Sequence, residues 1–173
     1  MVENRGFEPP MNDTAMELMS DQEIVISRTF RAPPHIVFEA WTRAELVKRW
    51  WAPKALGVQM VECQADVRAG GAYRYVIRSA AGNEYAFSGT YTEVTPPTRL
   101  VYTQVFEPMA GAGAVVVTVT FDEHGGRTRL MSRELYPSKE ARDAALASGM
   151  EKGMRDTMNQ LDELVLSLTG EVA

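Results

Sequence analysis

The sequence predicts an α+β domain in which a curved antiparallel sheet wraps around a long C-terminal helix, with two short helices after the first strand. Three features of the pattern favour this fold class. Apolar residues alternate at the period of a strand in residues 24–30, and two short helical stripes follow at once. Six further alternating segments occupy residues 58–134, and the chain then ends in a long helical stripe.

The first strand covers residues 24–30 and ends at the proline pair 33–34. Proline cannot donate to a sheet, and its fixed φ suits the first turn of a helix. A short apolar stripe in residues 36–41 predicts that helix. Thr42 can cap a second one, whose stripe runs through residues 46–51. Two short helices in this place can close one end of a curved sheet and turn it into a container.

The middle of the chain reads as successive strands joined by short turns that are rich in glycine and proline. Connections of this length join antiparallel neighbours. The expected strands are residues 58–66, 73–78, 85–92, 100–106, 115–121 and 128–134.

The pattern becomes helical for the last time after Ser138, a residue type suited to cap a helix. A single apolar stripe extends to Leu168, so we expect one helix over residues 138–168, the longest element. Gly149 and Gly153 lie inside it, where each costs about 1 kcal/mol relative to alanine. A close approach of a strand, or an opening for a ligand, would compensate for this cost.

One domain is the natural reading of 173 residues. Residues 1–20 are polar and break any periodicity, which predicts a flexible N-terminal tail, and the single domain then covers residues 21–170. The first residues lack the apolar core of a signal peptide. Cys63 is the single cysteine and cannot form an internal disulfide. We therefore expect a cytoplasmic protein.

The charge balance excludes two classes of partner. A net charge of -5 argues against nucleic acid or an anionic membrane, because both favour a basic face. No apolar run is long enough to span a bilayer.

Few residues are of the types that form catalytic or metal-binding sites. His35 follows the proline pair and His124 precedes a Gly-Gly turn, so both are expected to be solvated. Cys63 lies in an apolar strand, where a free cysteine is usually a small core residue. These residues show no zinc-ligand spacing and form no set of nucleophile and base. We expect no catalytic residue, metal or cofactor.

An apolar interior rich in aromatic and methionine side chains remains. These side chains either fill a core or line a cavity between the sheet and the final helix. Buried tyrosine hydroxyls need a partner or a ligand, and methionines adapt to variable shapes, which favours the cavity. The candidate ligand-binding residues are Trp50, Trp51, Tyr73, Tyr75, Tyr85, Phe87, Tyr102, Phe106, Met150, Met154 and Met158.

Several short motifs occur in a characteristic order along residues 24–168. They are Arg31-Ala32-Pro33-Pro34, Trp41, Arg49-Trp50-Trp51, Arg68-Ala69-Gly70-Gly71, Gly89-Thr90-Tyr91 and residues 96–103. With the final amphipathic helix, these motifs resemble the family of activator of heat shock protein 90 ATPase homologues, within the START-like helix-grip superfamily. Two features depart from the family pattern. The final helix carries Gly149-Met150 where the family often has Gly-Trp, and the chain is too short for the separate N-terminal chaperone-binding domain of the eukaryotic activators.

The resemblance implies a helix-grip fold, whose members commonly hold apolar ligands between sheet and helix. We expect this chain to bind a small, mostly apolar molecule without catalysis. One alternative is a cyclase- or aromatase-like enzyme that uses pocket tyrosines and a carboxylate such as Glu62 or Glu134 as acid–base groups. Another is a chaperone-interacting module that acts through its outer surface, and a homodimer also stays open.

Overall fold

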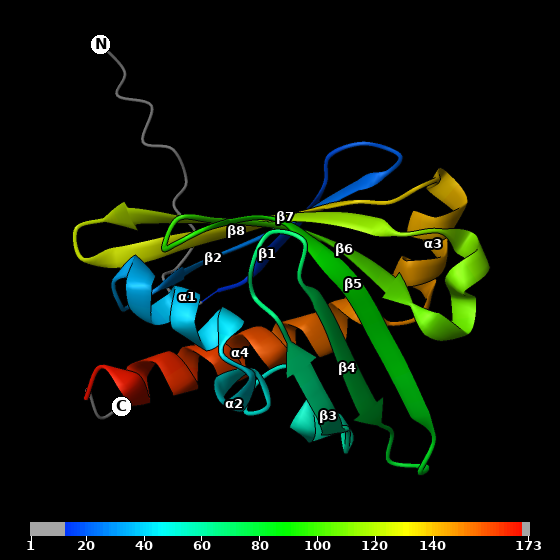
Figure 1. Ribbon diagram of the computed structural model, residues 1–173, viewed down its shortest axis with the longest axis horizontal. Helices are drawn as coiled ribbons and strands as arrows, with labels where there is room; N and C mark the ends of the chain where they lie inside the picture. Colours follow the sequence, from blue (N-terminus) through cyan, green and yellow to red (C-terminus); the bar gives the residue numbers. More distant parts are fainter. Residues whose placement is uncertain (1–12, 171–173) are drawn as a thin grey trace.

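A single antiparallel sheet of eight strands forms the frame of residues 13–170, the part of the chain that the computed structural model describes. The strands follow the spatial order β1-β2-β8-β7-β6-β5-β4-β3 (Figure 1). Their bounds are β1 Ala15–Leu18, β2 Glu23–Phe30, β3 Gln59–Ala65, β4 Ala72–Arg78, β5 Glu84–Thr95, β6 Arg99–Phe106, β7 Val115–His124 and β8 Arg127–Leu135.

The helices gather on one side of this sheet. Figure 1 shows α4 beneath the sheet, with α1 and α2 beside it and α3 toward the opposite end. The two short helices after the Glu23–Phe30 strand are confirmed. The helical elements are α1 Pro34–Thr42, α2 Ala44–Val47, α3 Lys139–Ala147 and α4 Met150–Leu168, with 3-10 turns η1 Lys54–Leu56 and η2 Glu107–Ala112.

Strand β1 lies in the segment for which the sequence pattern predicts a flexible tail. Residues Ala15–Leu18 pair with β2 along the edge of the sheet, and Thr14 is buried beside Arg28. The domain therefore begins earlier than residue 21, and residues 1–12 lie outside the described part. The residues Ala15–Leu18 do not alternate strictly between apolar and polar, so the sequence pattern does not reveal this strand, which forms by pairing with β2.

The expected helix over residues 138–168 is two helices. Gly149 separates them with a φ of 82°, a conformation that residues with a side chain rarely adopt. Ser138 caps α3 as expected, because its hydroxyl accepts a backbone N–H bond. Gly153 does lie within α4, but a Cβ there would meet Pro53 at 3.8 Å, an ordinary van der Waals distance, so no close approach of a neighbouring segment requires a glycine at this position.

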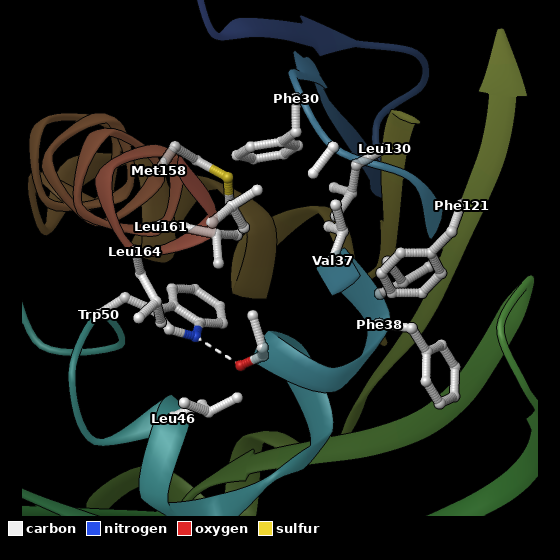
Figure 2. Packing of buried hydrophobic residues seen from close by; sticks show 14 of the residues in the cluster. Phe30, Val37, Phe38, Leu46, Trp50, Phe121, Leu130, Met158, Leu161 and Leu164 are labelled. Atoms are coloured by element: carbon white, nitrogen blue, oxygen red, sulfur yellow. Dashed lines mark hydrogen bonds between the residues drawn. The ribbon is translucent and has the colours of Figure 1, made fainter. Parts of the chain in front are cut away.

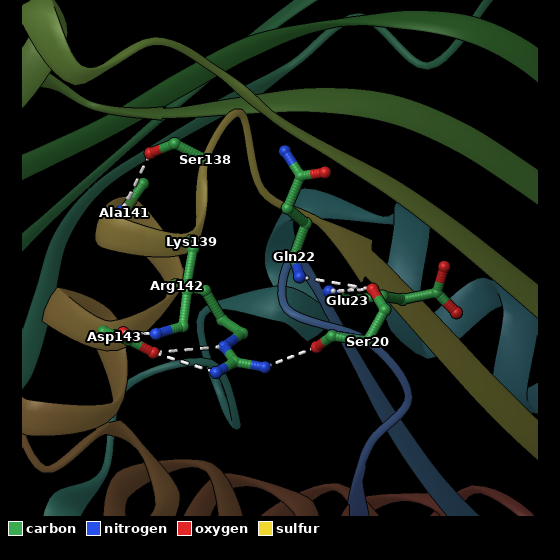
Figure 3. A network of polar contacts seen from close by, with 8 residues as sticks. All are labelled: Ser20, Gln22, Glu23, Ser138, Lys139, Ala141, Arg142 and Asp143. Atoms are coloured by element: carbon green, nitrogen blue, oxygen red, sulfur yellow. Dashed lines mark hydrogen bonds and ion pairs between the residues drawn. The ribbon is translucent and has the colours of Figure 1, made fainter.

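The turn between β1 and β2 holds α3 in place (Figure 3). The Ser20 hydroxyl accepts backbone N–H bonds from Gln22 at 3.2 Å and Glu23 at 3.1 Å, which fixes the turn. Arg142 of α3 then donates to the Ser20 carbonyl oxygen and pairs with Asp143. Helix α3 thereby closes the end of the domain where the inner face of β2 is apolar.

An apolar stripe of α4 covers the middle of the inner sheet face (Figure 2). Met158, Leu161 and Leu164 project from α4 toward the side where Phe30 and Leu130 lie, and all five side chains are buried. Burying a side chain of this size contributes about 1.5–3 kcal/mol. This packing confirms that α4 is the element that covers the sheet.

A buried ion pair joins α4 to the sheet at the edge of this stripe. Arg28 of β2 and Asp162 of α4 lie with Nη2 and Oδ2 3.5 Å apart, and Arg31 approaches the same oxygen to 3.7 Å. Arg28 also donates to Asn159 at 2.6 Å and to Thr14 at 3.1 Å. Burial lowers the pKa of Arg28, and the charge of Asp162 opposes that shift. The guanidinium group of Arg28 thus joins strand β2 to α4 and to Thr14, the residue that precedes β1.

We predict that Asp162→Asn lowers the free energy of unfolding by about 3–5 kcal/mol, because Arg28 would stay buried without its closest counter-charge. Urea denaturation measures the loss. The double variant Arg28→Met with Asp162→Leu should recover most of it, since both charges are then absent. Glu163→Gln, an exposed carboxylate on the same helix, serves as the control and should stay within about 0.5 kcal/mol of the wild type. Equal losses in the single and double variants would contradict a dominant role for charge.

Candidate functional site

Tyrosine side chains from β4, β5 and β6 stack on the inner face of the sheet. The ring of Tyr73 lies 5.0 Å from that of Tyr75, 5.4 Å from that of Tyr91 and 5.6 Å from that of Tyr102. Such separations are typical of aromatic pairs in tilted or edge-to-face contact. With Trp41 and Trp51, these four residues make up what we call the aromatic cluster.

Trp51 connects the cluster to a half-buried rim. Its ring contacts Tyr75 and Phe87, each at 5.1 Å between centroids. Phe87 in turn lies 5.0 Å from Phe106, and Phe106 lies 5.9 Å from Tyr85. The rim residues keep part of their surface in solvent, whereas Tyr73 and Tyr75 are buried. The aromatic surface is therefore continuous from the closed interior to solvent.

Gly89 makes room for one of these rings. A Cβ at Gly89 would lie 2.9 Å from the Tyr73 ring and 1.7 Å from the Thr103 carbonyl oxygen, so a side chain cannot be placed there. The Tyr73 ring crosses β5 at this point, and its hydroxyl donates to that oxygen at 2.7 Å. The glycine of the Gly89-Thr90-Tyr91 motif is thus explained by close packing inside the site.

The aromatic cluster encloses very little space. The cavity between its rings measures about 10 Å³, which is the volume needed for about one water molecule. A pocket for a drug-sized ligand needs about 300 Å³ or more. In this conformation the side chains fill their own interior, and a larger molecule must displace one of them. The lining residues are Trp41, Trp51, Tyr73, Tyr75, Tyr91, Tyr102 and Gln104.

Burial keeps the hydroxyl groups of the cluster neutral. It raises the pKa of Tyr73, Tyr75 and Tyr91, and with the nearby charge of Glu134 it raises the pKa of Tyr102. Burial also raises the pKa of the Cys63 thiol to about 11. A neutral thiol is a poor nucleophile, which agrees with its interpretation as a core residue.

Glu134 of β8 lies on the same inner face as Tyr102. Its backbone pairs with Val117 of β7, and Val117 pairs with Tyr102 of β6, so one residue separates the two along the sheet. Tyr136 donates its hydroxyl to Glu134 Oε2 at 3.1 Å and also lies 3.8 Å from Met150 Sδ. Burial raises the pKa of Glu134 to about 7, although the Tyr136 hydrogen bond acts in the opposite direction. This carboxyl group therefore titrates near physiological pH.

Two of the residues expected to line a ligand site belong to the filled core instead. Trp50 is 2% exposed and its indole N–H donates to the Ala40 carbonyl oxygen at 2.8 Å (Figure 2). Met158 is buried in the same core. Helix α2 ends at Val47, earlier than its stripe predicts. In the turn that follows, Trp50 is buried in the core, whereas Trp51 packs against both this core and the tyrosines of the aromatic cluster.

The other predicted residues fall into three groups. Trp51, Tyr73, Tyr75 and Tyr102 belong to the aromatic cluster, and Tyr85, Phe87 and Phe106 form its rim. Met150 and Met154 pack near Tyr136, at the α3 end of the interior.

Of the two carboxylates proposed as acid–base groups, Glu62 pairs with Arg74 at 3.4 Å in a shallow exposed depression and faces away from Cys63. Only Glu134 remains a candidate for such a role.

The sequence pattern did not predict four residues that belong to this region: Trp41, Tyr91, Gln104 and Tyr136. Tyr91 and Gln104 lie on the same alternating strand faces as residues that were predicted to line the site, so the pattern of alternation could have found them. Trp41 looked like part of a helical core stripe, and Tyr136 follows the last expected strand. Nothing in the sequence indicated that these two would contact the others.

Other kinds of site find little support. His35 and His124 are exposed, as expected. Residues 13–170 contain no group of three or more side chains placed to hold a metal ion. Within the same range, no helix is both long and apolar enough to cross a membrane.

The arrangement defines the class of the protein. A curved antiparallel sheet that holds a long C-terminal helix against its inner face, with two short helices after an early strand, is a helix-grip fold. The family model described as Activator of Hsp90 ATPase homolog 1-like protein matches residues 31–165. The chain belongs to this family.

Solved structures agree with this assignment. A protein from Rhodobacter sphaeroides is 26% identical with a TM-score of 0.82, over 90% of this chain and 99% of that chain. One from Mycobacterium smegmatis is 26% identical with a TM-score of 0.75, over 90% and 96% of the two chains. One from Nitrosomonas europaea, at 23% identity, shares the fold with a TM-score of 0.78 over 88% and 99%. No curated protein matches the sequence.

We predict that Glu134→Gln changes how stability depends on pH. Because folding raises the pKa of Glu134 from 4.5 to about 7, the folded state holds this proton more tightly than the unfolded state. The stabilisation is complete below about pH 4.5 and is lost as the pH rises through 7. Between pH 4.5 and 8 the wild type should lose about 1–3 kcal/mol relative to Glu134→Gln.

Urea denaturation at a series of pH values measures this difference, with Glu163→Gln as a variant that should follow the wild type. The nearby groups that titrate, Tyr102 and Tyr136, have raised pKa values and stay neutral over this range. Parallel stability curves for the wild type and Glu134→Gln would show that the carboxyl group is not held in an apolar environment.

Proposed function

We propose that the protein binds a small, mostly apolar molecule between the sheet and α4, without converting it. Membership of the family supports a ligand-binding helix-grip domain in general terms. The observation that carries the proposal for this chain is the continuous aromatic surface from the buried cluster to the half-buried rim. Flat apolar molecules bind well to such surfaces, because aromatic side chains offer large contact areas and specific stacking geometry.

The small volume of the cavity indicates which side chain would move. The segment that carries Trp51 is fixed from below, since the Gln160 side chain of α4 donates to the carbonyl oxygens of Trp50 at 3.0 Å and Ala52 at 2.8 Å. The side-chain oxygen of Gln160 also accepts a hydrogen bond from the backbone N–H of Lys54 at 2.9 Å. The backbone is therefore held while the Trp51 ring, half-buried, fills the space between Tyr75 and Phe87. A planar ligand would take the place of this ring.

We predict that the uncharged fluorescent probe N-phenyl-naphthylamine binds the wild type at about micromolar strength, or about -8 kcal/mol. Trp51→Ala should bind it at least about tenfold more tightly, since the volume of the ring becomes free, at a cost of about 3–5 kcal/mol in stability. Fluorescence titration and urea denaturation measure the two effects.

Val76→Ala is the matched control for loss of stability. Val76 follows Tyr75 on β4 but its side chain is buried on the opposite face of the sheet. This variant should lose stability and bind the probe as the wild type does. If Trp51→Ala is destabilised and binds no better than the wild type, the aromatic cluster is a filled core and the function lies on another surface.

A second candidate function, an acid–base catalyst, is favoured by one observation. Glu134 titrates near neutral pH and accepts a hydrogen bond from Tyr136, on the same face as the aromatic cluster. A carboxyl group with a pKa of about 7 suits proton transfer at physiological pH.

Native mass spectrometry of freshly purified protein distinguishes the two functions. Under the binding proposal, we predict a retained small molecule whose mass stays unchanged after prolonged incubation, in the wild type and in Glu134→Gln alike. Conversion of that molecule by the wild type, and not by Glu134→Gln, would instead support catalysis.

A further inference from the structure

Glu134 is a carboxyl group for which the described part of the chain supplies no cation. Its single polar contact there is the Tyr136 hydroxyl, 3.1 Å from Oε2, and no described side chain donates to Oε1. Glu134 is half-buried, and this burial is the main cause of its raised pKa, to which no charge of a described arginine or lysine contributes. The buried Asp162, by contrast, lies within 4 Å of two arginines.

The surroundings of Glu134 are apolar and aromatic. Ile24 and Val117 flank it on the neighbouring strands β2 and β7. Tyr102 lies one strand beyond Val117, close enough for the charge of Glu134 to raise its pKa. Met150 of α4 lies against the Tyr136 hydroxyl, so the carboxyl group is located between the aromatic cluster and the α3 end of the interior.

A carboxylate in such a place is costly unless an opposite charge compensates for it. An ammonium group would supply that charge and could donate an N–H to the free oxygen Oε1. The aromatic rings on the same face would favour a cation as well, because a positive charge is attracted to the face of a tryptophan or tyrosine ring. A neutral hydroxyl group could form the hydrogen bond but would leave the negative charge unbalanced.

We therefore propose that the ligand of this site is an arylalkylamine, with its flat aromatic part against the aromatic cluster and its protonated aliphatic nitrogen paired with Glu134. The proposal rests on the proposed function and names the class of molecule that the site accepts. In this proposal Glu134 determines the specificity for amines, and the aromatic rings provide the affinity for apolar molecules in general.

Two compounds that differ in one group test the pairing. Tryptamine and tryptophol share an indole ring and a two-carbon chain, and end in an amine and a hydroxyl group. Each displaces bound N-phenyl-naphthylamine at pH 8, where Glu134 is mostly ionised because its pKa is about 7. In the wild type, tryptamine should be effective at a concentration at least about tenfold lower than tryptophol, a difference of about 1.4 kcal/mol.

Glu134→Gln keeps the size of the side chain and removes its charge. This variant should still bind the probe, and its preference for tryptamine over tryptophol should fall to about one. Glu62→Gln is the matched control, because it removes the same charge from an exposed position outside the site, and it should keep the wild-type preference. A preference that survives in Glu134→Gln, or that is lost in Glu62→Gln, would overturn the proposal.

A measurement on the wild type alone makes the test independent of how the variants fold. Saturating tryptamine should lower the pKa of Glu134 by at least about one unit, because a nearby cation favours the charged form, whereas tryptophol should not. Carbon-detected NMR titration of the carboxyl group reports this shift. Equal displacement by both compounds, without a shift, would overturn the proposal and leave the proposed function standing. If neither the wild type nor Trp51→Ala binds the probe, both the proposed ligand class and the proposed function are overturned.

Discussion

The structure depends on the contact between the apolar stripe of α4 and the inner face of a single sheet. Leu161 and Val165 of α4 are fully buried there, and without this helix the inner face of β2, β7 and β8 would be open to water. The pair formed by Arg28 and Asp162 fixes the position of the helix along the sheet. Apolar contacts hold α4 against the sheet. The ion pair favours a single position of the helix along the sheet, because a shift would leave a buried charge without its partner and would cost free energy.

The candidate site follows from the same constraint. Helix α4 covers the middle of the sheet, so β4, β5 and β6 must bury their inner face in another way, and their own aromatic side chains do this together with Trp51. Because Gln160 of α4 also holds the backbone around Trp51, the helix that closes the core positions the residue that closes the aromatic cluster. One helix therefore both closes the core and holds the segment that carries Trp51.

Two carboxylates on the inner side of the sheet, the buried Asp162 and the half-buried Glu134, differ in how their charge is balanced. Asp162 has its counter-charges within the chain, and it belongs to the structural part of the molecule. Within residues 13–170, Glu134 has one hydrogen-bond partner, the Tyr136 hydroxyl; its pKa is raised, and it lies on the face that the aromatic cluster shares. Their residue types do not distinguish them in the sequence, since the difference lies in which side chains β2 and α4 bring to each one.

Local patterns in the sequence predicted the fold class, because alternation, turn residues and a final helical stripe can each be recognised from residues that are close together in the chain. It also indicated most of the aromatic residues of the site, which share strand faces. The sequence pattern did not show that β1 joins the sheet, that Gly149 breaks the last helix, or that Trp50 enters the core while Trp51 also packs on the aromatic cluster. Nor did it show that Asp162 pairs with arginines while Glu134 meets no cation within residues 13–170. These outcomes depend on contacts between segments that are far apart in the chain.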